Sequence, residues 1–146
     1  RPAAAAGPGA KALLEDVEQA LELVEEAQRV VQAARANRDK SFSLAQKMRR
    51  ARIPLERLHE AILAGAGREE DCDALRHAVM DLCDGLENSL EMIRKYGLDH
   101  ASAMRLWDWL FREAVAKDFQ RHEESLVRLV STLEARARRI APAAVA

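Results

Sequence analysis

Residues 35–58 read RANRDKSFSLAQKMRRARIPLERL, and the periodicity of this stretch decides the fold class. From here to residue 62, apolar positions recur three or four residues apart, which is the spacing of one face of an α-helix. Pro54 lacks a backbone donor and clashes with the preceding turn, which predicts a kink there. The stretch therefore predicts one kinked helix that ends at Gly65 to Gly67, with a stripe through Phe42, Ala45, Met48, Arg52, Leu55, Leu58 and Ile62, flanked by Leu44 and Ile53.

The residues before this stretch predict a first helix from about Ala10 to Ala34. Its apolar positions are again three, four and seven residues apart. Either Asn37 or Asp39 is expected to form the N-terminal cap of the next helix. The expected core stripe of the first helix consists of Leu13, Leu14, Val17, Leu21, Val24, Val31 and Ala34.

The residues after the stretch predict a third helix, which begins near Glu69. Acidic residues in its first turn interact favourably with the helix dipole. Gly97 stands where a C-terminal cap is expected, and Tyr96 is expected to close the end of the core. The predicted core face consists of Leu75, Val79, Leu82, Leu86, Leu90 and Ile93.

A long fourth helix is predicted to start at a cap formed by Asp99 or Ser102 and to stop before Pro142. At roughly 40 residues it would span about 60 Å. Short connections favour antiparallel neighbours, so the sequence predicts an all-α, antiparallel (up-down-up-down) four-helix bundle with a kinked second helix and a long fourth helix. The expected stripe of the fourth helix is Leu106, Trp107, Leu110, Phe111, Val115, Phe119, Leu126, Leu129, Leu133 and Ile140.

Composition supports one helical domain. The chain has 146 residues, only 4% of them aromatic, and only six glycines, as expected for long helices rather than a sheet. We expect a flexible linker at 1–9, the bundle at 10–141 and a disordered tail at 142–146. The start lacks the features of a signal peptide, which is consistent with an excised domain. No apolar run approaches the roughly 18 residues of a membrane span.

The motifs of enzymes and metal sites are missing from the sequence. The four histidines include no pair at the i, i+4 spacing of a helical zinc site, and Glu56 with His59 gives a single copy of the Glu-x-x-His motif that di-iron bundles use twice. Cys72 and Cys83 would lie about 16 Å apart on one helix, too far for a disulfide, which predicts a reduced, intracellular protein. We expect no catalytic residues, metal or cofactor.

The charge of residues 35–58 is segregated from the rest of the chain. This segment contains eight Lys and Arg residues but only two acidic residues, while the whole chain carries a net charge of −1. One interpretation is that acidic helices, with Glu15 to Glu26 and Glu69 to Asp73, neutralise this segment. The other is an anion-binding face, to which Arg128, Arg136, Arg138 and Arg139 could add. A pI near 6.5 and the lack of interleaved aromatics argue against nucleic acid, whereas each cation near an anionic bilayer contributes roughly 1 kcal/mol.

The order of motifs resembles the cell-death four-helix bundle at the N-terminus of mixed lineage kinase domain-like pseudokinases, fungal HeLo proteins and the coiled-coil domains of plant helper immune receptors. The resemblance starts at Arg35-x-Asn37-Arg38-x-Lys40, continues through Leu44-Ala45-x-Lys47-Met48-Arg49-Arg50 and reaches Pro54-Leu55-x-x-Leu58. Further motifs are Ala74-Leu75 to Tyr96, Ser102-x-x-Arg105-Leu106-Trp107, and Asp118-Phe119 followed by Leu126.

The resemblance implies a non-enzymatic module in a larger immune or cell-death protein, such as one of plant defence. It also implies self-association or binding of partner helices, contact with anionic phospholipid, and a cytoplasmic location with peripheral association at the plasma membrane. By analogy, Lys47, Arg49, Arg50, Arg52 and Arg57 would contact phospholipid headgroups. The alternative is a helical protein–protein interaction adaptor without a membrane role, which would dock through its last and first helices.

Overall fold

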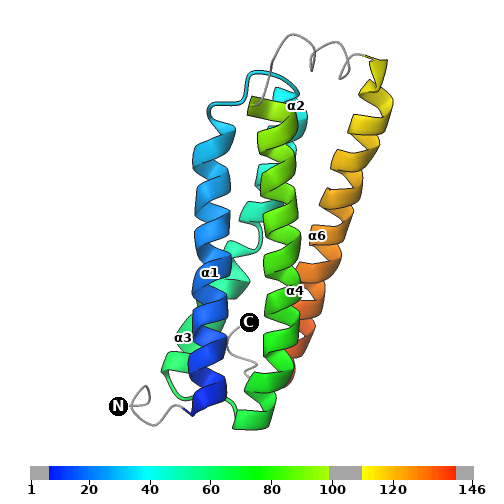
Figure 1. The fold of residues 1–146 in the computed structure, drawn as a ribbon. Helices are drawn as coiled ribbons and strands as arrows, with labels where there is room; N and C mark the ends of the chain where they lie inside the picture. The colour runs from blue at the N-terminus through cyan, green and yellow to red at the C-terminus, as the bar shows by residue number, and fades with distance from the viewer. Residues whose placement is uncertain (1–6, 99–109, 141–146) are drawn as a thin grey trace.

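The structure is a computed structural model that describes residues 7–98 and 110–140. Every element within these ranges is helical, which confirms the predicted all-α class. Asp99, Ser102, Leu106 and Trp107, the predicted tail at 142–146 and most of the predicted linker lie outside the described residues. The elements are α1 (Pro8–Val31), α2 (Arg38–Arg49), α3 (Arg52–Leu63), α4 (Glu69–Ile93), the π-helical segment η2 (Arg94–Leu98) and α6 (Arg112–Ile140) (Figure 1).

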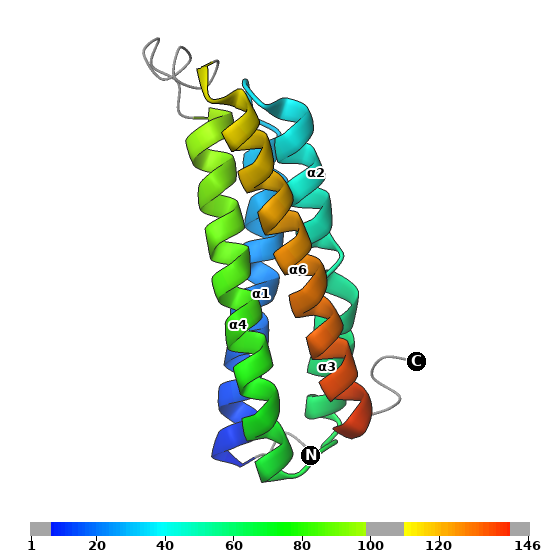
Figure 2. The same ribbon diagram turned by 90° about the vertical axis from the view of Figure 1, so that its right-hand side faces the viewer.

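The helices lie side by side along one long axis (Figures 1 and 2). In Figure 1 the chain rises along α1, returns along α2 and α3, rises along α4 and returns along α6. The most extensive helix contact joins α1 to α4, and α6 packs against α4 and α2. Each of these helices is therefore packed on at least two others, and the core lies between them.

The α1–α4 pair is parallel, because these helices are the first and third passes of a chain that reverses direction after each pass (Figure 1). Arg76 of α4 contacts Asp16 of α1 at 2.9 Å, and further along both helices Arg94 contacts Glu26 at 3.0 Å. Residue numbers thus increase together along the two helices. The chain reverses direction in the turn before α4, where Gly65 and Gly67 adopt positive φ values of 84° and 85° that glycine allows without strain.

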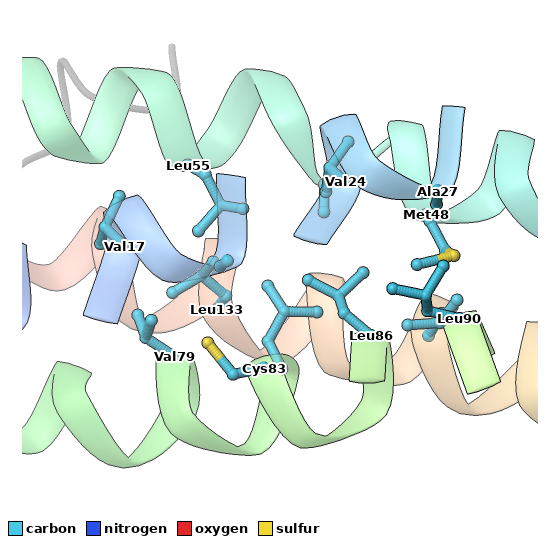
Figure 3. Close-up of a cluster of buried hydrophobic side chains, with 14 of the residues drawn as sticks. Val17, Val24, Ala27, Met48, Leu55, Val79, Cys83, Leu86, Leu90 and Leu133 are labelled. Carbon is cyan, nitrogen blue, oxygen red and sulfur yellow. The ribbon is translucent and has the colours of Figure 1, made fainter. Parts of the chain in front are cut away.

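The buried side of α1 differs in detail from the predicted stripe. Leu14 and Leu21 are only half-buried, while Ala20 and Ala27 are fully buried. The buried positions alternate by four and three residues, so the small alanines fall in the seam and allow neighbouring helices to approach closely. Figure 3 shows side chains from α1 meeting those of the other helices in one core. The seam consists of Leu13, Val17, Ala20, Val24, Ala27 and Val31.

The start of α1 lies inside the predicted linker. Pro8 is the first helical residue, where its missing N–H costs no hydrogen bond, and Gly9 is buried. The Gly9 N–H donates to the Glu69 carboxylate at the start of α4. The boundary predicted at residues 9 and 10 therefore moves to residues 7 and 8.

The predicted second helix is divided into α2 and α3 at Arg50 and Ala51, just before Pro54. Pro54 cannot donate to the Arg50 carbonyl, and the Ala51 N–H donates instead to the Met48 carbonyl at 3.0 Å, which tightens the turn. The buried positions nevertheless continue through the break with alternating steps of four and three residues, namely Leu44, Met48, Ala51, Leu55, Leu58 and Ile62. Ala51 and Pro54 are buried, whereas Arg52, which we expected on the stripe, is exposed.

The core face of α4 agrees with the prediction, because Leu75, Val79, Leu82, Leu86, Leu90 and Ile93 are all buried. The role expected for Gly97 is wrong, since positive φ values in the described residues occur only at Asn37, Gly65 and Gly67. The Gly97 carbonyl accepts hydrogen bonds from the N–H groups of Arg35 and Ala36 at 2.8 and 3.2 Å. An added Cβ would lie 3.0 Å from Ser41 Oγ, so Gly97 serves close approach rather than capping.

The C-terminal helix buries Val115, Phe119, Leu126 and Leu133, as the sequence predicts, and half-buries Leu129. Tyr96 packs on this core, with its ring centroid 6.2 Å from that of Phe119. Leu110 and Phe111 were expected in the same stripe but are 55% and 52% exposed. Both precede α6, which begins at Arg112, so its periodicity does not extend to them.

Candidate anion-binding surface

The five cations predicted to bind lipid do not share one face. Lys47 and Arg49 lie on α2 two residues apart, and two helical steps rotate a side chain by about 200°, so the two point in nearly opposite directions. Lys47 is half-buried, while Arg49 lines a groove beside Gln28 and Gln32 of α1. These two residues therefore cannot bind one flat surface together.

Arg52 is already neutralised within α3. Its Nε donates to Glu56 Oε1 at 2.7 Å, four residues further along the helix. That hydrogen bond and the charge of Glu56, followed by the charge of Glu25 on α1, raise the pKa of Arg52. Arg52 therefore contributes little net positive potential, although the sequence placed it among the lipid-binding residues.

Arg50 and Arg57 lie on one side of the α2–α3 segment with Ile53 between them. The three residues are spaced by three and four positions, which places them on one helix side, and all three are exposed. Ile53 is 59% exposed, the largest fraction among the exposed large apolar side chains. We call Arg50, Ile53 and Arg57 the basic ridge. The sequence placed Ile53 beside the apolar stripe, and the structure exposes it.

The remaining cations of the segment are used in part for folding. Arg38 donates from Nη1 to the Ala34 carbonyl at 2.9 Å, and its guanidinium lies 5.3 Å from the centroid of the Phe42 ring. These contacts fasten the connection between α1 and α2. Arg38 is thus held by the protein and is not directed to a ligand.

The acids of α1 neutralise α4 more than the basic segment. Asp16 and Glu26 form ion pairs with Arg76 and Arg94 of α4. Between α1 and α3, Glu18 Oε2 lies 3.3 Å from His59 Nε2. The charge of Glu25 on α1 also helps to raise the pKa of Arg52. Arg52 is thus neutralised mainly by Glu56 of its own helix and only in smaller part by Glu25 of α1, while the ion pairs within the described ranges include neither Arg49 nor Arg50.

The two thiols are free and buried in α4. Burial, followed by the charge of Asp16, raises the pKa of Cys83 to about 12, and its Sγ donates to the Asp16 carbonyl at 3.5 Å. Burial also raises the pKa of Cys72. Neither thiol is thus activated as a nucleophile. In residues 7–98 and 110–140, histidines, cysteines and carboxylates do not gather into a group of three or more that could hold a metal ion.

Comparison of the chain with protein-family models, with curated proteins and with solved structures returned no match in any of the three. The resemblance to the cell-death four-helix bundle therefore stays a prediction. Across the described part of the chain, the helices lack the length and apolar character needed to cross a bilayer.

Proposed function

We propose that this chain is a non-enzymatic, antiparallel-type helical bundle that serves as a signalling part of a larger immune or cell-death protein, where it self-associates and binds anionic membranes. The basic ridge carries this proposal, because it combines two exposed cations with an exposed isoleucine on one side of α2 and α3. Cations beside an apolar side chain are the combination by which interfacial helices bind anionic membranes.

The ridge supplies two kinds of attraction. Each arginine near an anionic leaflet contributes roughly 1 kcal/mol, and this part weakens as salt screens the charges. Ile53 adds a salt-insensitive part, because burying a side chain of this size from water contributes about 1.5–3 kcal/mol. Glu60, three residues after Arg57, opposes the attraction and limits the affinity of a single copy. Self-association would raise the affinity by presenting several ridges at once.

The test is co-sedimentation of charge-reversal variants with vesicles of phosphatidylserine and phosphatidylcholine. Arg50→Glu with Arg57→Glu should weaken binding by about tenfold or more, since two attractive charges become repulsive. The matched control reverses Lys11 and Arg29, two exposed cations of α1. Ile53→Ser should weaken binding that persists at high salt. If the ridge variant binds as the control does, the ridge is not the membrane surface.

A second candidate function, a helical adaptor without a membrane role, is favoured by the exposed apolar residues Leu110, Phe111 and Val127 at α6. A partner helix that covers them would bind through apolar contacts and would therefore resist salt. Leu110→Ser with Val127→Ser would then abolish self-association of the chain at both low and high salt. Analytical ultracentrifugation of this variant at low and high salt separates the two candidates.

A further inference from the structure

A second polar site lies between α4 and α6, on helices that do not contain the basic ridge. A pocket of about 250 Å³ is lined there by Asn88 and Ser89 of α4 and by residues of α6. Its volume is below the range of roughly 300–1,000 Å³ that suits drug-sized ligands, so a small ligand fits it better. The α6 lining consists of Arg121, His122, Ser125 and Arg128.

Ser89 gives the pocket an unsatisfied hydrogen-bonding group. The residue is 0% exposed, and its Oγ makes no hydrogen bond. Most buried hydroxyls in proteins have a partner, because an unpaired one loses its bonds to water without replacement. Ser89 lines the pocket, and because its Oγ is itself closed off from solvent, a ligand with an acceptor oxygen would supply the missing partner after a small side-chain rotation.

The other side chains that line the pocket make it cationic and rich in donors. Arg121 and Arg128 are seven residues apart on α6 and therefore share one side of that helix. Arg121 lies 3.4 Å from Asp118 Oδ1 in an exposed ion pair, whereas no ion pair is recorded for Arg128 in the described ranges. Carboxylates are missing from the pocket lining itself. The electrostatic balance thus favours an anion.

His122 adds a ring nitrogen of defined role. Its Nδ1 lies 2.8 Å from the Asp118 carbonyl oxygen, which can only accept, so Nδ1 carries a proton and donates. In the neutral ring Nε2 is then an acceptor, which suits an O–H group of a ligand. Because the ring is fixed by a backbone contact of its own helix, its position does not depend on the ligand.

From these observations we propose that the pocket between α4 and α6 binds a phosphate group. A tetrahedral dianion accepts several hydrogen bonds at once, and the pocket offers hydroxyl, amide and guanidinium donors around a small volume. The phosphate could belong to a soluble phosphate monoester or to a lipid headgroup, since the recognised chemistry is the same. The inference goes beyond the proposed function and uses none of the ridge residues.

The test is titration of the isotopically labelled chain with inorganic phosphate, followed by NMR. We expect saturable shifts at residues 85–89 and 121–128. Arg121→Gln with Arg128→Gln should weaken binding on the order of tenfold or more, and Ser89→Ala several-fold, because charge-assisted and neutral hydrogen bonds differ in strength. The matched control is Arg136→Gln with Arg138→Gln, which removes the same charge further along α6 and should bind as the wild type does.

The Ser89→Ala variant separates binding from folding. Removing a buried, unpaired hydroxyl should leave the urea midpoint unchanged or raise it, so weaker phosphate binding in this variant could not be attributed to unfolding. Absence of saturable binding, or equal affinity in the Ser89→Ala, double-arginine and control variants, would overturn the proposal.

Two further arms identify the source of the phosphate. Saturable binding of a soluble monoester such as glycerol phosphate indicates a free ligand, whereas binding only to phosphatidic acid vesicles indicates a lipid headgroup. Either result supports the site if the Arg121→Gln, Arg128→Gln variant loses that binding. The Arg50→Glu, Arg57→Glu variant should keep its phosphate affinity. Failure of the ridge and failure of the pocket are therefore distinguishable in the same set of proteins.

Discussion

Single residues fix the junction where α1 turns into α2. Asn37 adopts the left-handed region, with φ 48° and ψ 36°, and its Nδ2 donates to the Tyr96 carbonyl at 2.9 Å. We predict that Asn37→Ala lowers the free energy of unfolding by about 2 kcal/mol, from the lost hydrogen bond and the strain of a left-handed alanine. Because glycine adopts the left-handed region without strain, Asn37→Gly loses only the hydrogen bond and should lower the free energy of unfolding by about half as much. Equal urea midpoints for the two variants would contradict this account.

Cys83 makes stability depend on pH in the alkaline range. Its pKa rises from 9.0 to about 12 on folding, so above pH 9 the unfolded thiol ionises while the folded thiol keeps its proton. The stabilisation is complete below pH 9 and is lost as the pH rises towards 12, by up to about 1.4 kcal/mol per pH unit. Urea unfolding at pH 8 and pH 10 should show a larger loss for the wild type than for Cys83→Ala. Identical pH dependence of the two proteins would disprove the assignment.

At the scale of elements, the parallel packing of α1 on α4 depends on polar contacts as well as on the core. The Asp16–Arg76 pair is partly buried, with side chains 19% and 37% exposed, whereas Arg52 and Glu56 form a more exposed pair. We predict that Asp16→Asn lowers the free energy of unfolding by about 1–2 kcal/mol and that Glu56→Gln changes it by less than about 0.5 kcal/mol. The comparison requires chemical denaturation at one salt concentration. Similar costs for both variants would show that α1 and α4 do not depend on this contact.

Periodicity predicted the helices but not how they break and pair. The α4 face from Leu75 to Ile93 follows from spacing alone, because nothing interrupts that helix. Around Pro54 the same reasoning placed Leu55 and Leu58 correctly but Arg52 wrongly, because Ala51 takes the buried position between Met48 and Leu55. The pairing of α1 with α4 depends on the positive φ angles of the α3–α4 turn and on small residues such as Ala20, which spacing does not reveal.

For the whole molecule, the candidate site was predicted in composition but not in geometry. The excess of cations between residues 35 and 58 is visible in the sequence. In the fold, Lys47 and Arg49 point in different directions and Arg52 pairs with Glu56. Arg50 and Arg57 lie beside the exposed Ile53. The pocket between α4 and α6 was missed entirely. Its residues are far apart along the chain, and their common feature, an unpaired Ser89 hydroxyl near two arginines, exists only once the helices pack.

The central claim is that the basic ridge makes this bundle a membrane-binding module, and the most direct measurement is co-sedimentation of the wild-type chain with vesicles at 50 mM and 500 mM salt. The account predicts binding to phosphatidylserine vesicles at low salt, weaker binding at high salt because charges are screened, and no measurable binding to pure phosphatidylcholine. Equal binding to both vesicle types, or none to either at low salt, would contradict it and would favour the adaptor.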